Sequence, residues 1–357
     1  MHYSSSLSYT QGMPTLHDTT VLTKNVFKWG GAGIAGIILL VFLVRGGIAL
    51  FNVIFPKTPP PPTTVYGKMT AIPFPESKFT QNYTYTVDTI SGKLPVFPDR
   101  TEVFETVTPI PKLLNLRDAR VLVNKAQFAA GETVITDTVY SWRYNSNFNK
   151  KMTYNIVSKD FSIDSNFLTD PTLSEQFGTP TGENATLAVV DLLEGLELYP
   201  LSLDEAKTTT QYLYVQDAQT FPATSISSAQ ITRVDLFHGD LNKIPVVYPN
   251  PPFSSLYFLV KNGLEIVQGQ FTLQALKVPG ATYPIKSATQ ALEELKNGKG
   301  FIAAYYGESN EIVLKDSYLG YYMSDAKQQF IQPVIVFEGK NGFYAYVPAI
   351  TDEWLEK

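Results

Sequence analysis

Cysteine is absent from this chain of 357 residues, and histidine occurs only three times, as His2, His17 and His238. The absence of cysteine excludes disulfide frameworks, thiolate nucleophiles and cysteine-ligated metal sites. Histidines spread this thinly do not predict a metal-binding or catalytic cluster. The formal net charge of −5 lacks the basic excess that a nucleic-acid partner requires. We therefore expect no metal, no cofactor and no nucleic-acid partner, and we expect that the protein is not an enzyme.

Charged residues are scarce at 17%, whereas hydrophobic residues make up 44% of the chain and aromatic residues 13%. Low charge combined with this hydrophobicity favours a folded chain over a disordered one. The aromatic residues lie mostly in stretches whose composition is typical of β-strands. The composition therefore predicts a folded, sheet-rich protein that is better suited to contact than to catalysis.

A long apolar run spans residues 29–55, and Arg45 is its single charged residue. As a helix, Gly30–Phe55 would extend about 39 Å at about 1.5 Å per residue, more than a hydrocarbon core of about 30 Å. An arginine near the membrane centre costs about 2.5 to 3.5 kcal/mol, which the many apolar residues outweigh. We predict one transmembrane helix at 29–55, in which Arg45 either snorkels or pairs with a partner helix. A cleaved signal peptide fits less well, because the run is long and no small-residue cleavage site follows it.

The flanks of this run indicate its topology. Residues 1–28 would form a cytoplasmic tail, and 56–64 would form a proline-rich linker that holds the next region away from the membrane. Lysines flank both sides almost equally, so the positive-inside rule decides little. We expect the N-terminus inside the cell membrane and the C-terminal region outside, because that region lacks cysteine and is rich in Thr, Tyr, Asn and Pro.

Small residues occupy the start of the predicted membrane helix. Gly31 and Ala35 are four residues apart, as are Ala32 and Gly36, and this spacing lets two membrane helices approach closely. The same stretch matches the letters of a dinucleotide-binding loop, but it lacks the preceding strand and the later acid that such a site needs. We predict helix packing in the membrane through these four residues and Arg45, with ordinary membrane-helix composition as the alternative.

The region after the linker shows the order of a helix followed by strands three times, in 65–165, 166–280 and 281–357. In the first two stretches the helix is indicated by apolar residues at helical spacing, and Asn184 is the expected N-cap of the second helix. The residues at that spacing are Leu116, Ala119, Val123 and Ala126, then Leu187, Val190, Leu193 and Leu196. We predict an α+β fold, in which an N-terminal transmembrane helix precedes three modules of a helix on an antiparallel sheet.

The last module carries the clearest local signals. Ser287 and Gln290 have the spacing of a capping box, and apolar residues then follow at helical spacing. Runs rich in β-branched and aromatic residues follow at 301–306, 311–322, 329–338 and 342–350. Residues 339–342 read as a hairpin turn, and Asn262–Gly263 read as another hairpin upstream. The module is therefore expected to be one helix followed by an antiparallel meander.

The segments YPIKSATQALEELKNGKGFIAAYYG, IVLKDSYLGYYM and FIQPVIVFEGKNGFYAYVPAI, within Tyr283–Ile350, resemble the C-terminal region of the YycH/YycI proteins. They also resemble the broader PepSY-like module, a helix packed on a small antiparallel sheet. Upstream, VDLFHGDLNKIPVVYP and LVKNGLEIVQGQFTLQAL resemble the YycI-type pattern, so that the resemblance covers 233–350. The proline-rich linker and Arg45 are not part of the family pattern. The resemblance implies a membrane-anchored accessory regulator of a Gram-positive histidine kinase.

Other patterns support chemistry only weakly. Ser324 and Lys327 have the S-x-x-K spacing of some hydrolases, but the companion motifs are missing and the segment reads as a loop. Asp191, Glu194 and Glu197 lie three residues apart on a predicted helix, where a solvated face is the expected role rather than a metal site. His238 has no evident catalytic partners. No catalytic, cofactor-binding or metal-binding residue is predicted.

Five tyrosines in the last module form the candidate protein interface: Tyr305, Tyr306, Tyr318, Tyr321 and Tyr322. Exposed tyrosines offer a large contact area at a low entropic cost, although alternation along a strand would bury some of them. We predict a membrane-anchored, extracytoplasmic protein-binding regulator that modulates a sensor kinase or another envelope protein. The alternatives are a structural scaffold or surface-assembly subunit that self-associates, and a hydrolase that uses Ser324 and Lys327.

Overall fold

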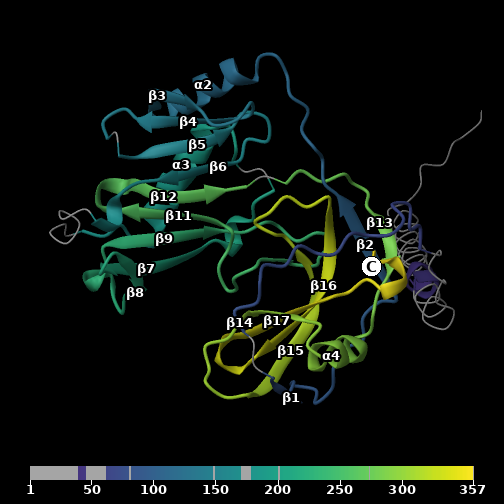
Figure 1. The fold of residues 1–357 in the computed structure, drawn as a ribbon. Helices are drawn as coiled ribbons and strands as arrows, with labels where there is room; N and C mark the ends of the chain where they lie inside the picture. The colour runs from purple at the N-terminus through teal and green to yellow at the C-terminus, as the bar shows by residue number, and fades with distance from the viewer. Residues whose placement is uncertain are drawn as a thin grey trace, which may run out of the picture. The chain divides into compact units, whose positions relative to one another are not determined.

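The computed structural model describes residues 39–45, 62–79, 82–147, 149–169, 178–199, 202–272 and 274–356. The chain divides into two compact units, Met1–Pro61 and Pro62–Lys357. Each unit is considered separately below, and Figure 1 labels the elements of the second unit.

The prediction of a transmembrane helix at 29–55 is wrong for the residues that the structure describes. Within that range, only Leu39–Arg45 are described, and they are helical. No helix in the described part of the chain is long and apolar enough to cross a membrane. A hydropathy sum measures the transfer free energy of the side chains and does not test whether the backbone forms one continuous helix. Arg45 is exposed, and the other predicted packing residues, Gly31, Ala32, Ala35 and Gly36, lie outside the described residues.

The larger sheet of the second unit is antiparallel and has the strand order β3-β4-β5-β6-β12-β11-β9-β7-β8. Figure 1 shows these strands side by side in this order. Their bounds are β3 (Phe128–Val134), β4 (Val139–Tyr144), β5 (Lys151–Asn155), β6 (Phe161–Asp164), β7 (Thr209–Gln216), β8 (Gln219–Pro222), β9 (Ile231–Leu236), β11 (Leu256–Lys261) and β12 (Glu265–Phe271).

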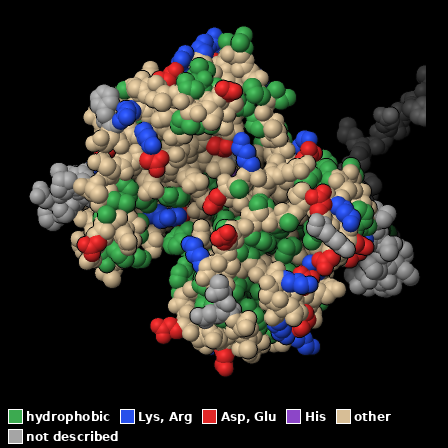
Figure 2. Space-filling model, in the orientation of Figure 1, with side chains coloured by type: hydrophobic (Ala, Val, Ile, Leu, Met, Phe, Trp, Pro, Cys, Tyr) green, Lys and Arg blue, Asp and Glu red, His purple; other side chains and the backbone are tan. Residues whose placement is uncertain are grey.

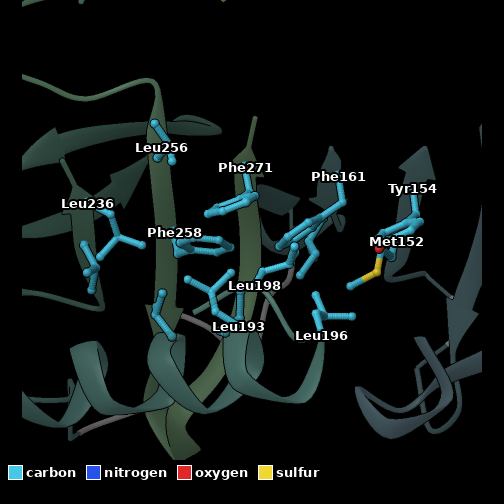
Figure 3. Close-up of a cluster of buried hydrophobic side chains, with 14 of the residues drawn as sticks. Met152, Tyr154, Phe161, Leu193, Leu196, Leu198, Leu236, Leu256, Phe258 and Phe271 are labelled. Carbon is cyan, nitrogen blue, oxygen red and sulfur yellow. The ribbon is translucent and has the colours of Figure 1, made fainter. Parts of the chain in front are cut away.

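One face of the larger sheet is covered by the helices α2 (Asn115–Lys125) and α3 (Gly182–Gly195). Alternate residues of each strand point to this face, so that Trp142 lies opposite Met152 and Met152 opposite Ile163. Figure 3 shows Phe258 and Phe271 on neighbouring strands, pointing toward Leu193 of α3. Because these side chains are almost entirely buried, they supply much of the hydrophobic stabilisation of this half.

The C-terminal sheet has the strand order β1-β15-β16-β17-β14 and three further strands, β2, β10 and β13, that pair outside this path. β1 and β10 are parallel to β15, and the other pairs are antiparallel. Their bounds are β1 (Thr84–Val87), β2 (Arg100–Glu105), β10 (Val246–Val247), β13 (Ala281–Pro284), β14 (Phe301–Ala304), β15 (Glu311–Tyr322), β16 (Phe330–Gly339) and β17 (Phe343–Pro348).

The helix α4 (Ala288–Lys296) covers one face of the C-terminal sheet. Its apolar residues Ala291, Leu292 and Leu295 pack with Ile335 and Phe337 of β16. The alternate residues of β16, such as Val334 and Val336, point to the other face and belong to a separate cluster. The two faces of β15–β17 therefore have different surroundings.

The predicted α+β fold of helix-on-sheet modules is wrong, because the described residues form mostly β-structure in two large sheets. Strand β6, from the first predicted module, pairs with β12 of the second, which joins both into one sheet. Strands β1 and β2, also from the first module, pair instead with the C-terminal strands β15 and β16. An alternating pattern of apolar residues identifies a strand but not its partner, because strands pair through backbone N–H and C=O groups that every strand carries. The predicted order of each helix and the strands that follow it is confirmed.

The predictions of local structure are more accurate than the prediction of how the strands assemble into sheets. The hairpins at Asn262–Gly263 and at 339–342 are confirmed, since β11 pairs with β12 and β16 with β17. The predicted cap of α3 is wrong: Thr181 is the N-cap, and its side chain accepts a hydrogen bond from the backbone N–H of Asn184. Leu187 was expected on the buried face but is 55% exposed. The predicted face used a strict three-residue spacing, which drifts around a helix of 3.6 residues per turn, whereas the buried residues Ala185, Val189 and Leu193 are four apart.

The capping box of α4 is confirmed and gives a stability prediction. The Ser287 Oγ accepts the backbone N–H of Gln290 at 3.2 Å, and the Gln290 Oε1 accepts the backbone N–H of Ser287 at 2.9 Å. Replacing Ser287 with alanine is expected to lower the free energy of unfolding by about 1 kcal/mol. Urea denaturation should show this loss, whereas Thr289→Ala, at an exposed position of the same helix, should cost nothing. Equal effects of the two changes would contradict the prediction.

Candidate functional site

The five tyrosines of the predicted interface lie in different surroundings. Tyr321 and Tyr322 are completely buried, so they are not available to a partner. The Tyr321 hydroxyl donates to the backbone carbonyl of Glu102 at 2.9 Å, and the Tyr322 ring packs against Phe74 with centroids 4.8 Å apart. Consecutive residues of a strand point to opposite faces, and here both faces are covered, by separate clusters.

The remaining three tyrosines reach the surface to different extents. Tyr306 is 67% exposed, whereas Tyr305 and Tyr318 are half-buried. The Tyr305 hydroxyl donates to the backbone carbonyl of Ser309 at 2.7 Å, and its ring meets Tyr83 edge-on. Tyr305 therefore supports the local loop, and Tyr306 and Tyr318 remain as candidates for contact.

Tyr306 and Tyr318 belong to a cluster that also contains Glu338 and Tyr344, and we name these four residues the Tyr–Glu surface. Within the sheet, Glu338 of β16 lies directly opposite Tyr344 of β17. The Tyr318 hydroxyl donates to the Glu338 Oε1 at 2.6 Å, and the Glu338 carboxylate also raises the pKa of Tyr344, after burial. The carboxylate of Glu338 thus lies between two tyrosines on the sheet face opposite α4.

Tyr306 is held beside this group by the β16–β17 turn. Its backbone N–H donates to the carbonyl of Asn341 at 2.9 Å. Gly342 adopts φ +61°, and a Cβ there would approach the Tyr306 ring to 2.6 Å. Glycine is therefore required at this position for two reasons: it adopts the positive φ without strain, and it leaves room for the Tyr306 ring. The turn places an exposed aromatic ring at the edge of the surface.

The electrostatics of the Tyr–Glu surface favour protonated tyrosines around one carboxylate. Burial, and secondly the hydrogen bond to Glu338, raise the pKa of Tyr318 well above its usual range. Burial likewise raises the pKa of Tyr344, with Glu338 as the next cause. Asp316, which is exposed, lies opposite Glu338 on the neighbouring strand β15. The surface therefore combines π-faces and hydroxyl donors with negative charge, and no basic side chain belongs to it.

The pairing of Glu338 and Tyr344 was missed at the level of sequence, although a signal for it existed. Residues 339–342 were recognised as a hairpin turn, and such a turn fixes which residues of the two strands lie opposite each other. Counting outward from 339–342 would place Glu338 opposite Phe343, but the structure pairs Gly339 with Phe343 around the shorter loop 340–342, and this register places Glu338 opposite Tyr344. Tyr318 could not be added in this way, since its strand is joined to β16 by a longer connection.

The other sequence motifs do not assemble into chemical sites. The Ser324 Oγ donates to the carbonyl of Pro73 and accepts the N–H of Ala326, whereas Lys327 is exposed. Asp191, Glu194 and Glu197 are exposed on or beside α3, and Glu197 pairs with Lys125 at 3.1 Å.

His238 is buried, with its Nδ1 2.8 Å from the Tyr248 hydroxyl. Within the described ranges, no group of three or more His, Asp or Glu side chains is placed to hold a metal ion.

Charge on the face drawn in Figure 2 does not single out any other area. Figure 2 shows basic and acidic side chains interspersed over the face that it draws, without a broad area of one sign. Interspersed charges of this kind keep a surface soluble and do not mark a binding site. The candidate site is therefore defined by local geometry.

Comparisons with known proteins give only distant similarities. No protein-family model and no curated protein sequence matches the chain. Among solved structures, the chain is similar to an uncharacterized protein from Eubacterium rectale, with a TM-score of 0.41 and 13% identity over 76% of this chain and 90% of that chain. It is also similar to the Bacillus megaterium YpeB C-terminal domain, with a TM-score of 0.34 and 13% identity over 69% of this chain and 95% of that chain.

Neither similarity shows membership of the YycH/YycI family. Similarities at this level carry no conclusion about function. The candidate site therefore rests on its own residues.

Proposed function

We propose that this chain is a non-catalytic protein-binding module whose Tyr–Glu surface holds a lysine or arginine side chain of a partner protein. The observation that carries the proposal is the Glu338 carboxylate between tyrosines, with the exposed ring of Tyr306 at its edge. This arrangement offers a cation both a counter-charge and aromatic faces.

The physical basis is the preference of cations for such surroundings. An ammonium or guanidinium group within about 6 Å of an aromatic ring gains about 0.5 to 2 kcal/mol. Hydrogen bonds to charged groups, here between the cation and Glu338, contribute about 1.5 to 3 kcal/mol net. Tyrosine is also enriched among the residues that dominate protein–protein binding energies. A single cationic side chain, flanked by apolar residues of the partner, would use all of these contributions.

The wider role that we propose is regulation by contact. The Tyr–Glu surface lies within the segment Tyr283–Ile350 that resembles the YycH/YycI and PepSY-like proteins. By this resemblance, the partner would be a sensor kinase or another protein of the cell envelope. The partner would then present a basic segment to the C-terminal sheet, and binding would promote or restrain its activity.

A self-assembling scaffold is less well supported, because the outer strands of the larger sheet are poorly suited to pairing. Strand β8 has only four residues and ends at Pro222, which has no N–H to donate. Strand β3 pairs irregularly with β4, with register shifts at two places. Short strands, prolines and bulges are the features that prevent edge-to-edge association.

The proposal is tested by binding of a labelled peptide that contains alternating arginine and glycine. Fluorescence anisotropy with the full-length chain should show binding, and Glu338→Gln should weaken it about tenfold, since the counter-charge is lost while the shape is kept. Tyr306→Ser should have a similar effect. A peptide with glutamine in place of arginine should not bind.

The matched control is another tyrosine–glutamate pair, Tyr199 and Glu205, whose hydroxyl and carboxylate oxygens are 2.5 Å apart at the surface. Glu205→Gln should leave peptide binding unchanged, because this pair is not part of the Tyr–Glu surface. The proposal is wrong if Glu338→Gln binds the arginine peptide as well as the unchanged protein does. It is also wrong if the glutamine peptide binds equally well.

A further inference from the structure

A cavity of about 310 Å³ lies in the half of the molecule that contains the larger sheet, far in sequence from the Tyr–Glu surface. It is lined by the C-terminal end of α2, by α3 and by the turn between β11 and β12. Its polar lining residues include Lys125, Lys150, Asp191 and Glu265. Its volume is at the small end of the range of known ligand sites.

Lys150 is the unusual residue of this cavity, because its side chain is only 5% exposed. Its Nζ lies 4.0 Å from the centre of the Tyr144 ring and 5.7 Å from that of Phe128. The nearest carboxylate oxygen, Oε1 of Glu265, is 3.5 Å away. A lysine ammonium has three donors, and a buried cation normally has close acceptors for them. Two aromatic faces and one long ion pair leave Lys150 with donor capacity for a further acceptor.

Glu265 forms ion pairs with two lysines, Lys150 and Lys261. Its other oxygen, Oε2, lies 3.2 Å from the Nζ of Lys261, closer than the contact with Lys150. One carboxylate therefore serves two ammonium groups, and this group of three residues has a net positive charge. Burial lowers the pKa of the Lys150 amine, while Glu265 acts in the opposite direction. Because the effect of burial is the larger of the two, the Glu265 carboxylate does not fully offset the cost of burying the Lys150 ammonium.

The rest of the cavity lining is suited to an apolar body. Phe128, Ile163, Leu192, Leu264 and Ile266 line it together with small residues of α3. Lys125, the other lysine of the lining, is half-exposed and already pairs with Glu197 at 3.1 Å. Lys150 is thus the lysine of this cavity whose ammonium can donate a further hydrogen bond, and apolar side chains surround the space beside it.

From this geometry we propose that the cavity binds a small organic carboxylate, whose carboxylate group is held by Lys150 and whose apolar body packs between α3 and the β11–β12 turn. The ligand supplies the second acceptor that Glu265 cannot supply while it is shared with Lys261. The site is independent of the Tyr–Glu surface, because no residue belongs to both. Binding here would therefore survive a failure of the proposed protein-binding function.

The test is isothermal titration calorimetry of the full-length chain with 4-methylpentanoate and 3-phenylpropanoate, each compared with its uncharged amide. At least one carboxylate should bind, and its amide should bind at least tenfold more weakly. Lys150→Met should weaken carboxylate binding at least tenfold. This variant is expected to fold, since it removes a buried charge, keeps the apolar stem and leaves Glu265 paired with Lys261.

The matched control is Lys125→Met, which removes a lysine from the same cavity lining without removing a buried charge. It should change carboxylate affinity less than threefold. The proposal is overturned if neither carboxylate binds, if an amide binds as tightly as its carboxylate, or if Lys150→Met retains the affinity of the unchanged protein. Thermal unfolding of each variant, measured in parallel, confirms that it is folded.

Discussion

Replacing Asp235 with alanine is expected to lower the free energy of unfolding by about 3 to 5 kcal/mol. Asp235 of β9 is only 1% exposed. Both of its oxygens accept hydrogen bonds from the Arg233 guanidinium at 2.7 Å, and Oδ1 also accepts the backbone N–H of Ser254 at 3.0 Å. Alanine would leave a largely buried cation and a buried N–H without their acceptor.

The surroundings of Arg233 make this loss difficult to relieve. Its guanidinium carbon lies 4.3 Å from the centre of the Tyr257 ring and 4.8 Å from that of Phe253. Its side chain is 19% exposed, so water can replace only part of the lost interaction. The aromatic rings stabilise the cation less than a bidentate carboxylate does.

Urea denaturation of the full-length chain measures this effect, with two comparisons. Glu293→Ala removes the partner of Lys296 in an exposed pair on α4, and it should cost less than about 1 kcal/mol. Replacing Arg233 with methionine together with Asp235→Asn removes both charges and keeps an acceptor for Ser254, so it should cost less than Asp235→Ala. A loss below about 1 kcal/mol for Asp235→Ala would contradict the prediction.

The second large effect is expected from acid, through His238. Burial lowers the pKa of this imidazole from 6.5 to about 4. In the unfolded chain, His238 takes up a proton as the pH falls through about 6.5, whereas the folded protein resists protonation until about pH 4. The contribution of the neutral imidazole to stability is therefore complete above about pH 6.5 and decreases between about pH 6.5 and 4. The loss between pH 7 and 4.5 should be about 2 to 3 kcal/mol.

The structure indicates why the folded protein excludes this proton. His238 is 5% exposed, its Nδ1 contacts the Tyr248 hydroxyl, and its buried Nε2 has no hydrogen-bond partner in the described part of the chain. Carboxylates elsewhere also take up protons in this range, so the measurement must be a difference. In His238→Gln, the change in the free energy of unfolding between pH 7 and 4.5 should be smaller by about 2 kcal/mol than in the unchanged protein. Identical pH dependence of the two proteins would refute the assignment.

Short-range features of the fold were predictable from the sequence. The capping box at Ser287, the hairpins at Asn262–Gly263 and 339–342, and the strands β14 to β17 depend on residues within a few positions of one another. Backbone sterics and local hydrogen bonds decide such features. The prediction failed even locally at Asn184, because Thr181 offered a competing cap three residues earlier.

Long-range assembly was not predictable in the same way. The pairing of β6 with β12 joins residues that are more than 100 positions apart in the chain, such as Ile163 and Gly269. The same is true of the candidate site, in which Tyr318 and Glu338 meet only because β15 and β16 pair. The tyrosines that looked equivalent in the sequence differ completely in exposure, from 67% for Tyr306 to 0% for Tyr321 and Tyr322.

The sequence by itself excluded cysteine chemistry, through the absence of that residue, and placed the β11–β12 hairpin, the strands β14 to β17 and the cap of α4. Tertiary structure alone decided that two predicted modules share one sheet, that Lys150 is buried beside a cavity, and that Glu338 lies between tyrosines. The physical reason is that turns and caps are determined by neighbouring residues, whereas strand partners and burial depend on how the whole chain excludes water from its apolar side chains.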